Sequence, residues 1–360
     1  MTKVIVGMSG GVDSSVAAWL LNRQGFEVEG LFMKNWEEDD DEKYCAAAAD
    51  LADAQQVCNK LDIPLHTINF SSEYWDRVFS NLVDEYQAGR TPNPDIICNR
   101  EIKFRAFLDY ALDLKTDYIA TGHYVRCETG PDSMCLKKAR DGDKDQSYFL
   151  HTLDQGQLER SLFPLGKIKK SEVRAIAREQ GFTVHDKKDS TGICFIGERK
   201  FRDFLKEYIP ARPGPIMTTD GDVIGEHEGV MFYTIGQRQG LGIGGQANLP
   251  EEPWYVADKD IHTNSLFVAQ GQQHAALFHS TILTQTIHWI AGQPPGNTKN
   301  LGAKIRYRQS DQACSVQPYQ DTGYKISFVR PQWAVAPGQS VVFYEQDTCL
   351  GGGIIEARKS

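Results

Sequence analysis

Residues 4–15 read VIVGMSGGVDSS, and this stretch decides the fold of the first part of the chain. Its β-branched start, residues 4–6, predicts a buried strand, and residues 12–15 open the apolar pattern of a helix. Between strand and helix, residues 9–11 allow a tight turn that brings backbone N–H groups toward an anion. Because the helix N-terminus behind the turn adds partial positive charge, the stretch predicts a phosphate-binding loop.

This loop differs from the two commonest nucleotide-binding motifs. It lacks the Gly-Lys-Ser/Thr ending of a Walker loop, which holds the β- and γ-phosphates, and it is not the GxGxxG of a dinucleotide site. Ser9 and Ser14 supply hydroxyl donors, and Asp13 is suited to hold Mg²⁺ beside a pyrophosphate. An ordinary glycine turn with a serine cap is the alternative, but strand, loop and helix follow in the order that a phosphate site needs.

The sequence around the loop alternates short β-branched runs with helical patterns, which is typical of a parallel sheet covered by helices. The pattern predicts strands over residues 4–8, 28–33, 64–70 and 117–121, and helices over residues 14–23, 44–61, 74–88, 100–112 and 171–180. We therefore expect an α/β domain with a doubly wound parallel sheet, which carries the catalytic site, over residues 1–209.

The character of the chain changes after the proline-rich stretch at residues 210–215, which cannot continue a helix. Short glycine-interrupted strands follow, for example at residues 230–235 and 254–258, and such strands are typical of small barrels or sandwiches. We expect a small β-rich central domain over residues 210–272 and a C-terminal β-barrel over residues 273–360.

Composition and charge limit the class of protein. The 360 residues contain no run of about 20 apolar residues, and the first residues show no signal-peptide pattern, so we expect a cytoplasmic protein without a membrane segment. The formal net charge of −9, taken alone, argues against a nucleic-acid partner. Between residues 167 and 206, however, eleven Lys or Arg stand against six Asp or Glu, which suits either contact with phosphates or a solvated helix face.

Two of the eight cysteines stand in segments that suit sulfur chemistry. Cys98 follows a proline-interrupted loop at its transition into a helix, and a helix N-terminus lowers the pKa of a thiol and favours thiolate. Cys194 lies in the polar segment DSTGICF, where Lys187, Lys188 and Arg199 would stabilise a thiolate or persulfide. For either cysteine alone, an inert half-buried thiol is the alternative. The sequence contains neither the CxxC pair of a disulfide oxidoreductase nor the ligand spacing of a structural zinc site.

SGGVDSS resembles the PP-loop of the ATP pyrophosphatase superfamily, whose members cleave ATP between the α- and β-phosphates and adenylate a carbonyl oxygen. The chain as a whole resembles the tRNA-specific 2-thiouridylase family (MnmA/TrmU). The matching segments are GMSGGVDSS, GLFMKNW, GRTPNPDIICN, TGHY, KDQSYFL, KDSTGICFIGERKF, YTIGQRQGLGIGG, EEPWYV, KIRYRQ, APGQSVVFY and CLGGGIIE, which span nearly the full length. The resemblance implies an enzyme, a tRNA-uridine 2-sulfurtransferase whose first domain is of the PP-loop type.

The resemblance further implies that the enzyme uses ATP with Mg²⁺. The nucleotide would be bound by the loop, by the end of the second strand and by a glycine after a later strand: Gly7, Met8, Ser9, Gly10, Gly11, Val12, Asp13, Ser14, Met33 and Gly122, with Asp13 holding the metal. These positions agree with the rule that ligands bind at the carboxyl ends of strands in open α/β sheets.

The reaction implied by the resemblance converts the wobble uridine of certain tRNAs to 2-thiouridine. Adenylation at O2 of the uracil, with release of pyrophosphate, precedes attack of sulfur on C2 and loss of AMP. Cys194 resembles the residue that receives sulfur as a persulfide, and Cys98 resembles the partner thiol, which either forms a disulfide with Cys194 or reduces the persulfide to hydrosulfide. Asp95 would act as a base or orient the uracil edge, and a repulsive or metal-binding carboxylate near the thiols is the alternative.

The resemblance also implies contacts with the tRNA anticodon loop, whose bases are splayed out before they are read. Asn93, Pro94 and Asp95 would contact the target base, and the other tRNA-contacting positions would be His123, Lys144, Asp145, Gln146, Arg306, Tyr307 and Gln339. The expected partners are tRNA and a persulfide sulfur-carrier protein or a cysteine desulfurase. The expected state of the chain is a monomer.

Three alternatives stay open. A PP-loop ligase that joins an amine to an adenylated carboxylate would need ATP but neither of the two cysteines. A noncatalytic RNA-binding protein would carry its function in the barrel and would form no AMP. An iron-sulfur cluster held by Asp95, Cys98 and Cys194 would replace the scheme in which a persulfide is resolved by a disulfide.

Overall fold

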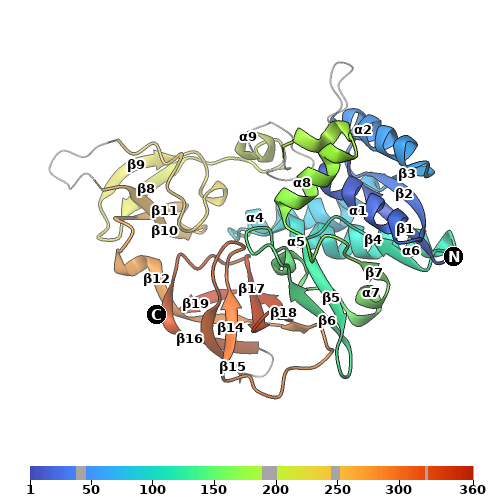
Figure 1. The fold of residues 1–360 in the computed structure, drawn as a ribbon. Coiled ribbons are helices and arrows are strands. Elements are labelled where there is room, and N and C mark those ends of the chain that lie inside the picture. Colours follow the sequence, from blue (N-terminus) through green and yellow to red (C-terminus); the bar gives the residue numbers. More distant parts are fainter. Residues whose placement is uncertain (38–45, 189–200, 245–251, 321–322, 360) are drawn as a thin grey trace.

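A computed structural model gives the fold and describes residues 1–37, 46–188, 201–244, 252–320 and 323–359. Figure 1 shows an α/β part at the N-terminus, a small β-rich middle part, and a large sheet that holds the C-terminus. None of the helices in these ranges is long and apolar enough to span a membrane.

The α/β part is built on a five-stranded sheet with the strand order β3-β2-β1-β4-β7. The strands are β1 (Lys3–Met8), β2 (Glu27–Lys34), β3 (Leu65–Asn69), β4 (Tyr118–Ala120) and β7 (Ser161–Leu162). All of their pairings are parallel, and β1 lies in the centre between β2 and β4. The predicted parallel sheet is therefore confirmed, and the carboxyl end of β1 faces the point where the strand order reverses.

Helices cover both faces of this sheet because β1 is apolar on both. Val4, Val6 and Met8 pack with α1 (Val12–Arg23), α2 (Ala46–Leu61) and α8 (Lys170–Glu179), whereas Ile5 packs with the helices of the opposite face. That second layer consists of α3 (Ser71–Tyr74), the π-helical turn η1 (Trp75–Phe79), α4 (Ser80–Gln87), α5 (Pro94–Cys98), the π-helical segment η2 (Asn99–Ala106) and α6 (Phe107–Asp113). The doubly wound arrangement is confirmed.

The helical stretch that contains Cys98 begins earlier than the predicted start at Arg100. Pro94 occupies the first helical position, and the Asn93 side chain accepts a hydrogen bond from the Asp95 N–H at 3.1 Å, which caps α5. From there α5, η2 and α6 follow one another without a break. Cys98 therefore lies one turn inside the helix, and the expectation that it stands at a helix N-terminus was wrong.

The middle part is a four-stranded sheet with the order β10-β11-β8-β9. Its strands are β8 (Gly214–Thr218), β9 (Val223–His227), β10 (Trp254–Asp260) and β11 (Ser265–Gln270). The strand predicted over residues 230–235 was wrong, because Val230–Phe232 forms a short 3₁₀ helix, η5. Val230, Phe232, Tyr233 and Ile235 are buried and Met231 is half-buried, and such a nearly continuous buried run does not distinguish strand from helix by its periodicity.

The C-terminal part is a ten-stranded sheet whose pairings are antiparallel. Its strands are β12 (Phe278–Thr284), β13 (His288–Trp289), β14 (Leu301–Lys304), β15 (Gln312–Tyr319), β16 (Gly323–Trp333), β17 (Ser340–Glu345), β18 (Thr348–Ile354) and β19 (Ala357–Lys359), joined by β5 (Val125–Thr129) and β6 (Met134–Lys138). The β-rich middle part and the barrel-type C-terminal part agree with prediction.

The hairpin of β5 and β6 connects the first part of the chain to the last. Leu136 of β6 lies opposite Cys349 of β18, so strands from the α/β part extend the C-terminal sheet (Figure 1). The remaining short helices are η3 (Ser147–Leu150), α7 (Gln155–Glu159), η4 (Thr183–Asp186), α9 (Phe201–Leu205) and η6 (Ala275–Leu277). The boundaries 1–209, 210–272 and 273–360 stay a prediction, and the shared sheet was not expected.

Candidate active site

The predicted phosphate loop is the turn between β1 and α1. Gly10 has φ of +69°, and a Cβ there would lie 2.7 Å from the Asp50 Cα, so only glycine fits. The Ser14 hydroxyl donates to the Gly11 carbonyl at 3.1 Å and accepts from the Ser9 N–H at 3.2 Å. No described side chain caps α1 at Gly11, which leaves the first-turn N–H groups directed at the loop.

The other predicted nucleotide-binding residues lie beside this loop. A Cβ on Gly7 would come within 3.4 Å of the Met33 Cε, and a Cβ on Gly122 would lie 2.9 Å from the backbone of Asp13 and Ser14. Met33 is near the end of β2, and Gly122 follows β4. The three strands thus present these residues at one edge of the sheet, as predicted, while nucleotide binding there stays a prediction.

Asp13 is engaged by two side chains that the sequence did not indicate. Lys170, at the start of α8, donates to both carboxylate oxygens of Asp13 at 2.8 Å, and the Tyr124 hydroxyl donates at 2.7 Å. The Lys170 side chain is 10% exposed. A magnesium ion at Asp13 would have to share this carboxylate with Lys170, and the described residues contain no group of three or more His, Cys, Asp or Glu that could hold a metal ion.

A second lysine also reaches the loop. Lys187 Nζ donates to the Gly10 carbonyl at 3.0 Å and pairs with Asp50 at 2.7 Å and with Asp53 at 2.6 Å. These pairings raise the pKa of Lys187 although burial opposes them. The expected effect of Lys187 on sulfur at Cys194 stays a prediction, because Cys194 lies outside the described residues, and the described partners of the Lys187 ammonium group connect Gly10 with α2.

The helix α5 presents the predicted base-contacting and sulfur-handling residues. Asp95 is half-buried, and burial raises the pKa of its carboxyl group, with the Lys103 charge acting in the opposite direction. Cys98 is 5% exposed and lies in the apolar core of the second helical layer. Asn99 is 2% exposed, its amide donates to the Phe149 carbonyl at 3.3 Å, and its Oδ1 has no described partner.

The predicted Cys194 lies outside the described residues, as do its neighbours from 189 to 200. The structure therefore describes one of the two predicted cysteines. It also leaves the proposed three-ligand iron-sulfur set incomplete, because only Asp95 and Cys98 of that set fall in described ranges.

His123 connects the loop to the helix. It follows Gly122, and its ring lies 5.7 Å from the Phe104 ring of η2. Its Nδ1 is 2.8 Å from the Thr121 hydroxyl. Burial, and to a smaller degree the Lys103 charge, hold the pKa of His123 well below its usual value, so the ring is neutral at pH 7. With 8% of its surface exposed, His123 offers little area for the predicted contact with tRNA.

The predicted tRNA-contacting stretch at residues 144–146 is partly internal. Lys144 and Gln146 are half-buried, and the Gln146 side chain accepts from the Tyr124 N–H at 2.9 Å. Asp145 is buried and accepts from the Ala139 N–H at 3.1 Å and the Ser147 hydroxyl at 2.9 Å. The Asp145 carboxylate therefore organises the start of η3.

The three predicted contacts in the C-terminal part also have internal partners. Arg306 donates to the carbonyls of Ile235 and Ala334 at 2.9 and 2.8 Å. The Tyr307 ring lies 4.5 Å from that of Phe149, and the Gln339 amide donates to the Thr91 carbonyl at 2.7 Å. These residues join the parts of the molecule, a role that their sequence context did not indicate.

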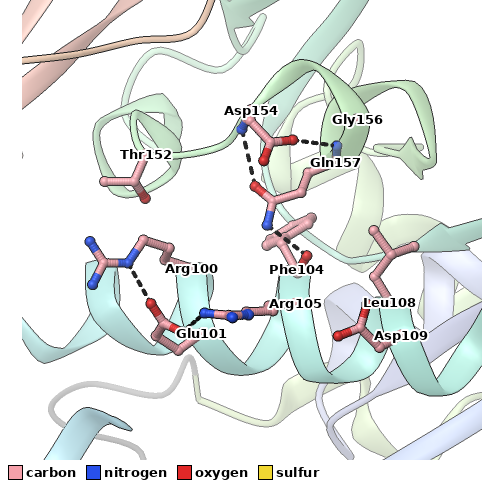
Figure 2. Close-up of a pocket in the computed structure, with 10 residues that line it drawn as sticks. All are labelled: Arg100, Glu101, Phe104, Arg105, Leu108, Asp109, Thr152, Asp154, Gly156 and Gln157. Carbon is pink, nitrogen blue, oxygen red and sulfur yellow. Dashed lines mark hydrogen bonds and ion pairs between the residues drawn. The ribbon is translucent and has the colours of Figure 1, made fainter.

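A pocket of about 400 Å³ lies between η2 and the residues around α7, and Figure 2 shows the side chains that line it. Arg100 and Arg105 both pair with Glu101 there, and Gln157 of α7 donates to the Phe104 carbonyl at 2.8 Å. None of the predicted site residues lines it.

Family models match the chain from residue 2 to residue 355 with two short gaps. Residues 2–198 match the family described as tRNA methyl transferase HUP domain, residues 202–270 the tRNA methyl transferase PRC-barrel domain, and residues 279–355 the aminomethyltransferase beta-barrel domain. Among solved structures, an NMN synthetase from Francisella tularensis matches at 20% identity with a TM-score of 0.33 over 52% of this chain and 66% of its own.

Full-length relatives are much more similar. The tRNA-specific 2-thiouridylase MnmA of Marinobacter nauticus is 60% identical over 358 residues, which are 99% of this chain and 91% of its own. The MnmA proteins of Salmonella arizonae and Shigella flexneri are each 60% identical over 357 residues, 99% of this chain and 97% of theirs. The three matched families together account for nearly all of the chain, and the relatives match it from end to end. The chain belongs to the tRNA-specific 2-thiouridylase (MnmA) family.

Proposed function

We propose that this chain uses ATP to adenylate O2 of the wobble uridine of tRNA and then replaces that oxygen with sulfur delivered through Cys194 and Cys98. The thiolation of tRNA follows from membership of the 2-thiouridylase family over 99% of the chain. The single observation that carries the mechanism is the packing that joins the phosphate loop to the helix of Asp95 and Cys98.

This junction is the segment that follows β4. Gly122 packs against the backbone of Asp13 in the phosphate loop. The next residue, His123, packs against Phe104 of η2, which continues the helix that begins with Asp95 in its first turn. The charge of Lys103 acts on both Asp95 and His123. A base that reaches Asp95 would therefore meet a nucleotide held by the loop.

The phosphate loop and Lys170 account for the ATP half of the reaction. The first-turn N–H groups of α1 and the Lys170 ammonium would bind the phosphates, because both present positive charge at one place. Mg²⁺ would neutralise phosphate charge, and among the described residues Asp13 is the side chain at the loop that would hold it. Lys170 and Tyr124 would then shift from Asp13 toward the phosphates.

Asp95 supports the uracil half of the reaction. Its pKa is raised by burial, which brings the carboxyl group closer to the range where it exchanges protons with a substrate. Asn93 and Pro94 set its place at the first turn of α5, and they would contact the base beside it. The adenylated uracil would thus present C2 toward Cys98.

The sulfur step balances without a further oxidant. The terminal sulfur of a Cys194 persulfide attacks C2 and AMP leaves with the former oxygen. The Cys98 thiolate then attacks Sγ of Cys194, so that a Cys98–Cys194 disulfide forms and the sulfur remains on the base. An external thiol reduces the disulfide before the next turnover. In the second version, Cys98 attacks the persulfide first and releases hydrosulfide, which attacks C2.

The iron-sulfur alternative remains a separate proposal with its own test. Protein purified without oxygen would contain stoichiometric iron and acid-labile sulfide if Asp95, Cys98 and Cys194 hold a cluster. A persulfide mechanism predicts neither. The sulfur donor, proposed to be a sulfur-carrier protein or a cysteine desulfurase, the monomeric state and the cytoplasmic location are likewise proposals.

Isotope labelling tests the adenylation step. Uracil labelled with ¹⁸O at O2 of the wobble uridine should transfer its label to AMP, and mass spectrometry of AMP would detect it. Transfer is expected because the oxygen leaves with the phosphate that activated it. AMP without the label, formed while 2-thiouridine accumulates, would contradict activation at O2.

A further inference from the structure

The segment between α4 and α5, residues 88–92, is held from two sides before the chain enters the helix of Asp95. It joins Gln87, the last residue of α4, to Asn93, the N-cap of α5. Within it Thr91 and Pro92 are buried. We call residues 88–92 the strap, because its position fixes where α5 begins.

The C-terminal part holds the strap by hydrogen bonds to its backbone. The Thr91 N–H donates to the Pro337 carbonyl at 2.9 Å, and the Gln339 amide donates to the carbonyls of Thr91 and Pro92 at 2.7 and 3.3 Å. Gly338 has φ of +92°, and a Cβ there would lie 2.7 Å from the Thr91 nitrogen. The two backbones therefore approach as closely as glycine allows.

The middle part holds the strap from another direction. The Thr91 hydroxyl donates to the Thr234 hydroxyl at 3.3 Å. Gly89 has φ of +75°, and a Cβ there would lie 2.6 Å from Cδ1 of Ile261 in the loop after β10. Arg306 ties Ile235, the neighbour of Thr234, to the C-terminal part. The middle part and the C-terminal part thus both contact the strap.

The connection from the strap to the helix is stiff. Pro92 and Pro94 have φ fixed near −65°, and the residues that precede them, Thr91 and Asn93, are confined to extended conformations. Asn93 has φ of −112° and ψ of 99°, which agrees with this restriction. Because four consecutive residues have little rotational freedom, a displacement at Thr91 passes to the first turn of α5.

We propose that the strap is the connection through which the middle and C-terminal parts set the position of the first turn of α5, with Gln339 and Thr234 as positioning residues. The inference rests on the proposed function, because Asp95 and Cys98 are what the strap positions. It gives the Gln339 amide a role inside the protein. tRNA bound to the middle and C-terminal parts would then affect the positions of Asp95 and Cys98 through the strap.

Three variants test this assignment by single-turnover thiolation at saturating tRNA. Gln339→Met keeps the side-chain size and removes two hydrogen bonds, so the rate should fall about tenfold. Thr234→Val removes one longer bond and should lower the rate about threefold. Gln317→Met, at an exposed position of β15, is the control and should stay within about twofold. The dissociation constant for tRNA should stay within about twofold in all three.

Amide hydrogen exchange gives a second readout that does not need catalysis. Exchange over residues 88–98 should become faster in Gln339→Met and stay unchanged in Gln317→Met. A weaker affinity for tRNA with an unchanged rate at saturation would overturn the proposal, and so would unchanged exchange in Gln339→Met. If the parent protein forms no 2-thiouridine, the proposed function fails, while the exchange result still decides the role of the strap.

Discussion

Replacement of Lys170 by methionine isolates the ion pair at the phosphate loop. Lys170 Nζ lies 2.8 Å from each oxygen of Asp13, and the two side chains are 10% and 33% exposed. Methionine keeps the apolar length of the side chain and removes its charge. Among the described residues, the Asp13 carboxylate would then keep only the Tyr124 hydroxyl, at 2.7 Å, as a donor.

The magnitude follows from the degree of burial. Removing one partner of a buried ion pair costs about 3–5 kcal/mol, whereas an exposed pair contributes about 0–1 kcal/mol. Because Asp13 is one-third exposed, we expect the free energy of unfolding to fall by about 2 kcal/mol, a factor of about 30 in the unfolding equilibrium. The bare carboxylate would also repel phosphate, so the affinity for ATP should fall by at least about tenfold.

Urea unfolding and calorimetric titration with ATP measure the two effects in Lys170→Met, in Asp13→Asn and in the double variant. The double variant should recover most of the lost stability, because neither charge is left without its partner. Lys167→Met, at an exposed position nearby, is the control. Unchanged stability and ATP affinity in Lys170→Met, or a double variant no more stable than Lys170→Met, would refute the reasoning.

Three further predictions concern the same region. Gly10→Ala should destabilise the protein by at least about 2 kcal/mol in thermal melting, because its Cβ would meet Asp50 and φ is positive there. A Cβ at Gly11 would meet only Ser9 Oγ, at 3.5 Å, so the control Gly11→Ala should melt near the parent. Equal melting of the two variants would be inconsistent with this. Burial raises the pKa of Asp95 in the folded protein above its unfolded value. The protonated carboxyl group therefore stabilises the fold at pH values below the unfolded pKa, and this stability is lost as the pH rises through the folded pKa and the buried group ionises. Asp95→Asn should therefore raise Tm at pH 7 and change it little near pH 3, and a lower Tm at pH 7 would disprove the sign. Lys187→Met should lower the free energy of unfolding in urea by about 1 kcal/mol, because Asp50 and Asp53 lose their shared partner. The control Lys188→Met, at an exposed position, should leave this free energy unchanged. Equal effects of the two variants would exclude a stabilising role for the contacts of Lys187 with Gly10, Asp50 and Asp53.

The strand, loop and helix around Gly10 could be predicted because every signal they need is local. The β-branched run, the glycines and the apolar helical pattern follow one another within residues 4–15, and each requires the same fold. The doubly wound sheet and the edge that gathers Gly7, Met33 and Gly122 follow from the same pattern with the rule for carboxyl ends of strands.

The partners of buried charges could not be predicted, because they come from distant parts of the chain. Lys170 belongs to a basic stretch that suggested a surface for phosphates, yet it pairs with Asp13, 157 positions away. Arg306 and Gln339 are polar residues that resembled RNA contacts, and their hydrogen bonds join separate parts of the molecule. Sequence patterns report which residues are polar but not which polar groups meet after folding.

The pairing of β6 with β18 is another long-range result. Leu136 of β6 lies opposite Cys349 of β18. The sequence of the β5–β6 hairpin contains no local signal that tells whether its edge strand pairs with another strand or stays exposed. For a similar reason the composition of residues 99–106 predicts an ordinary helix, whereas the structure has π-helical turns there, whose width is set by packing.

The most direct test of the central claim is the formation of 2-thiouridine by the purified protein. The protein is incubated with ATP, Mg²⁺, a persulfide donor and unmodified tRNA, and the nucleosides are analysed by mass spectrometry. We expect 2-thiouridine at the wobble position together with AMP, and we expect Cys194→Ser to abolish thiolation while ATP binding is retained. A tRNA that gains no sulfur, or a Cys194→Ser protein with full activity, would contradict the account.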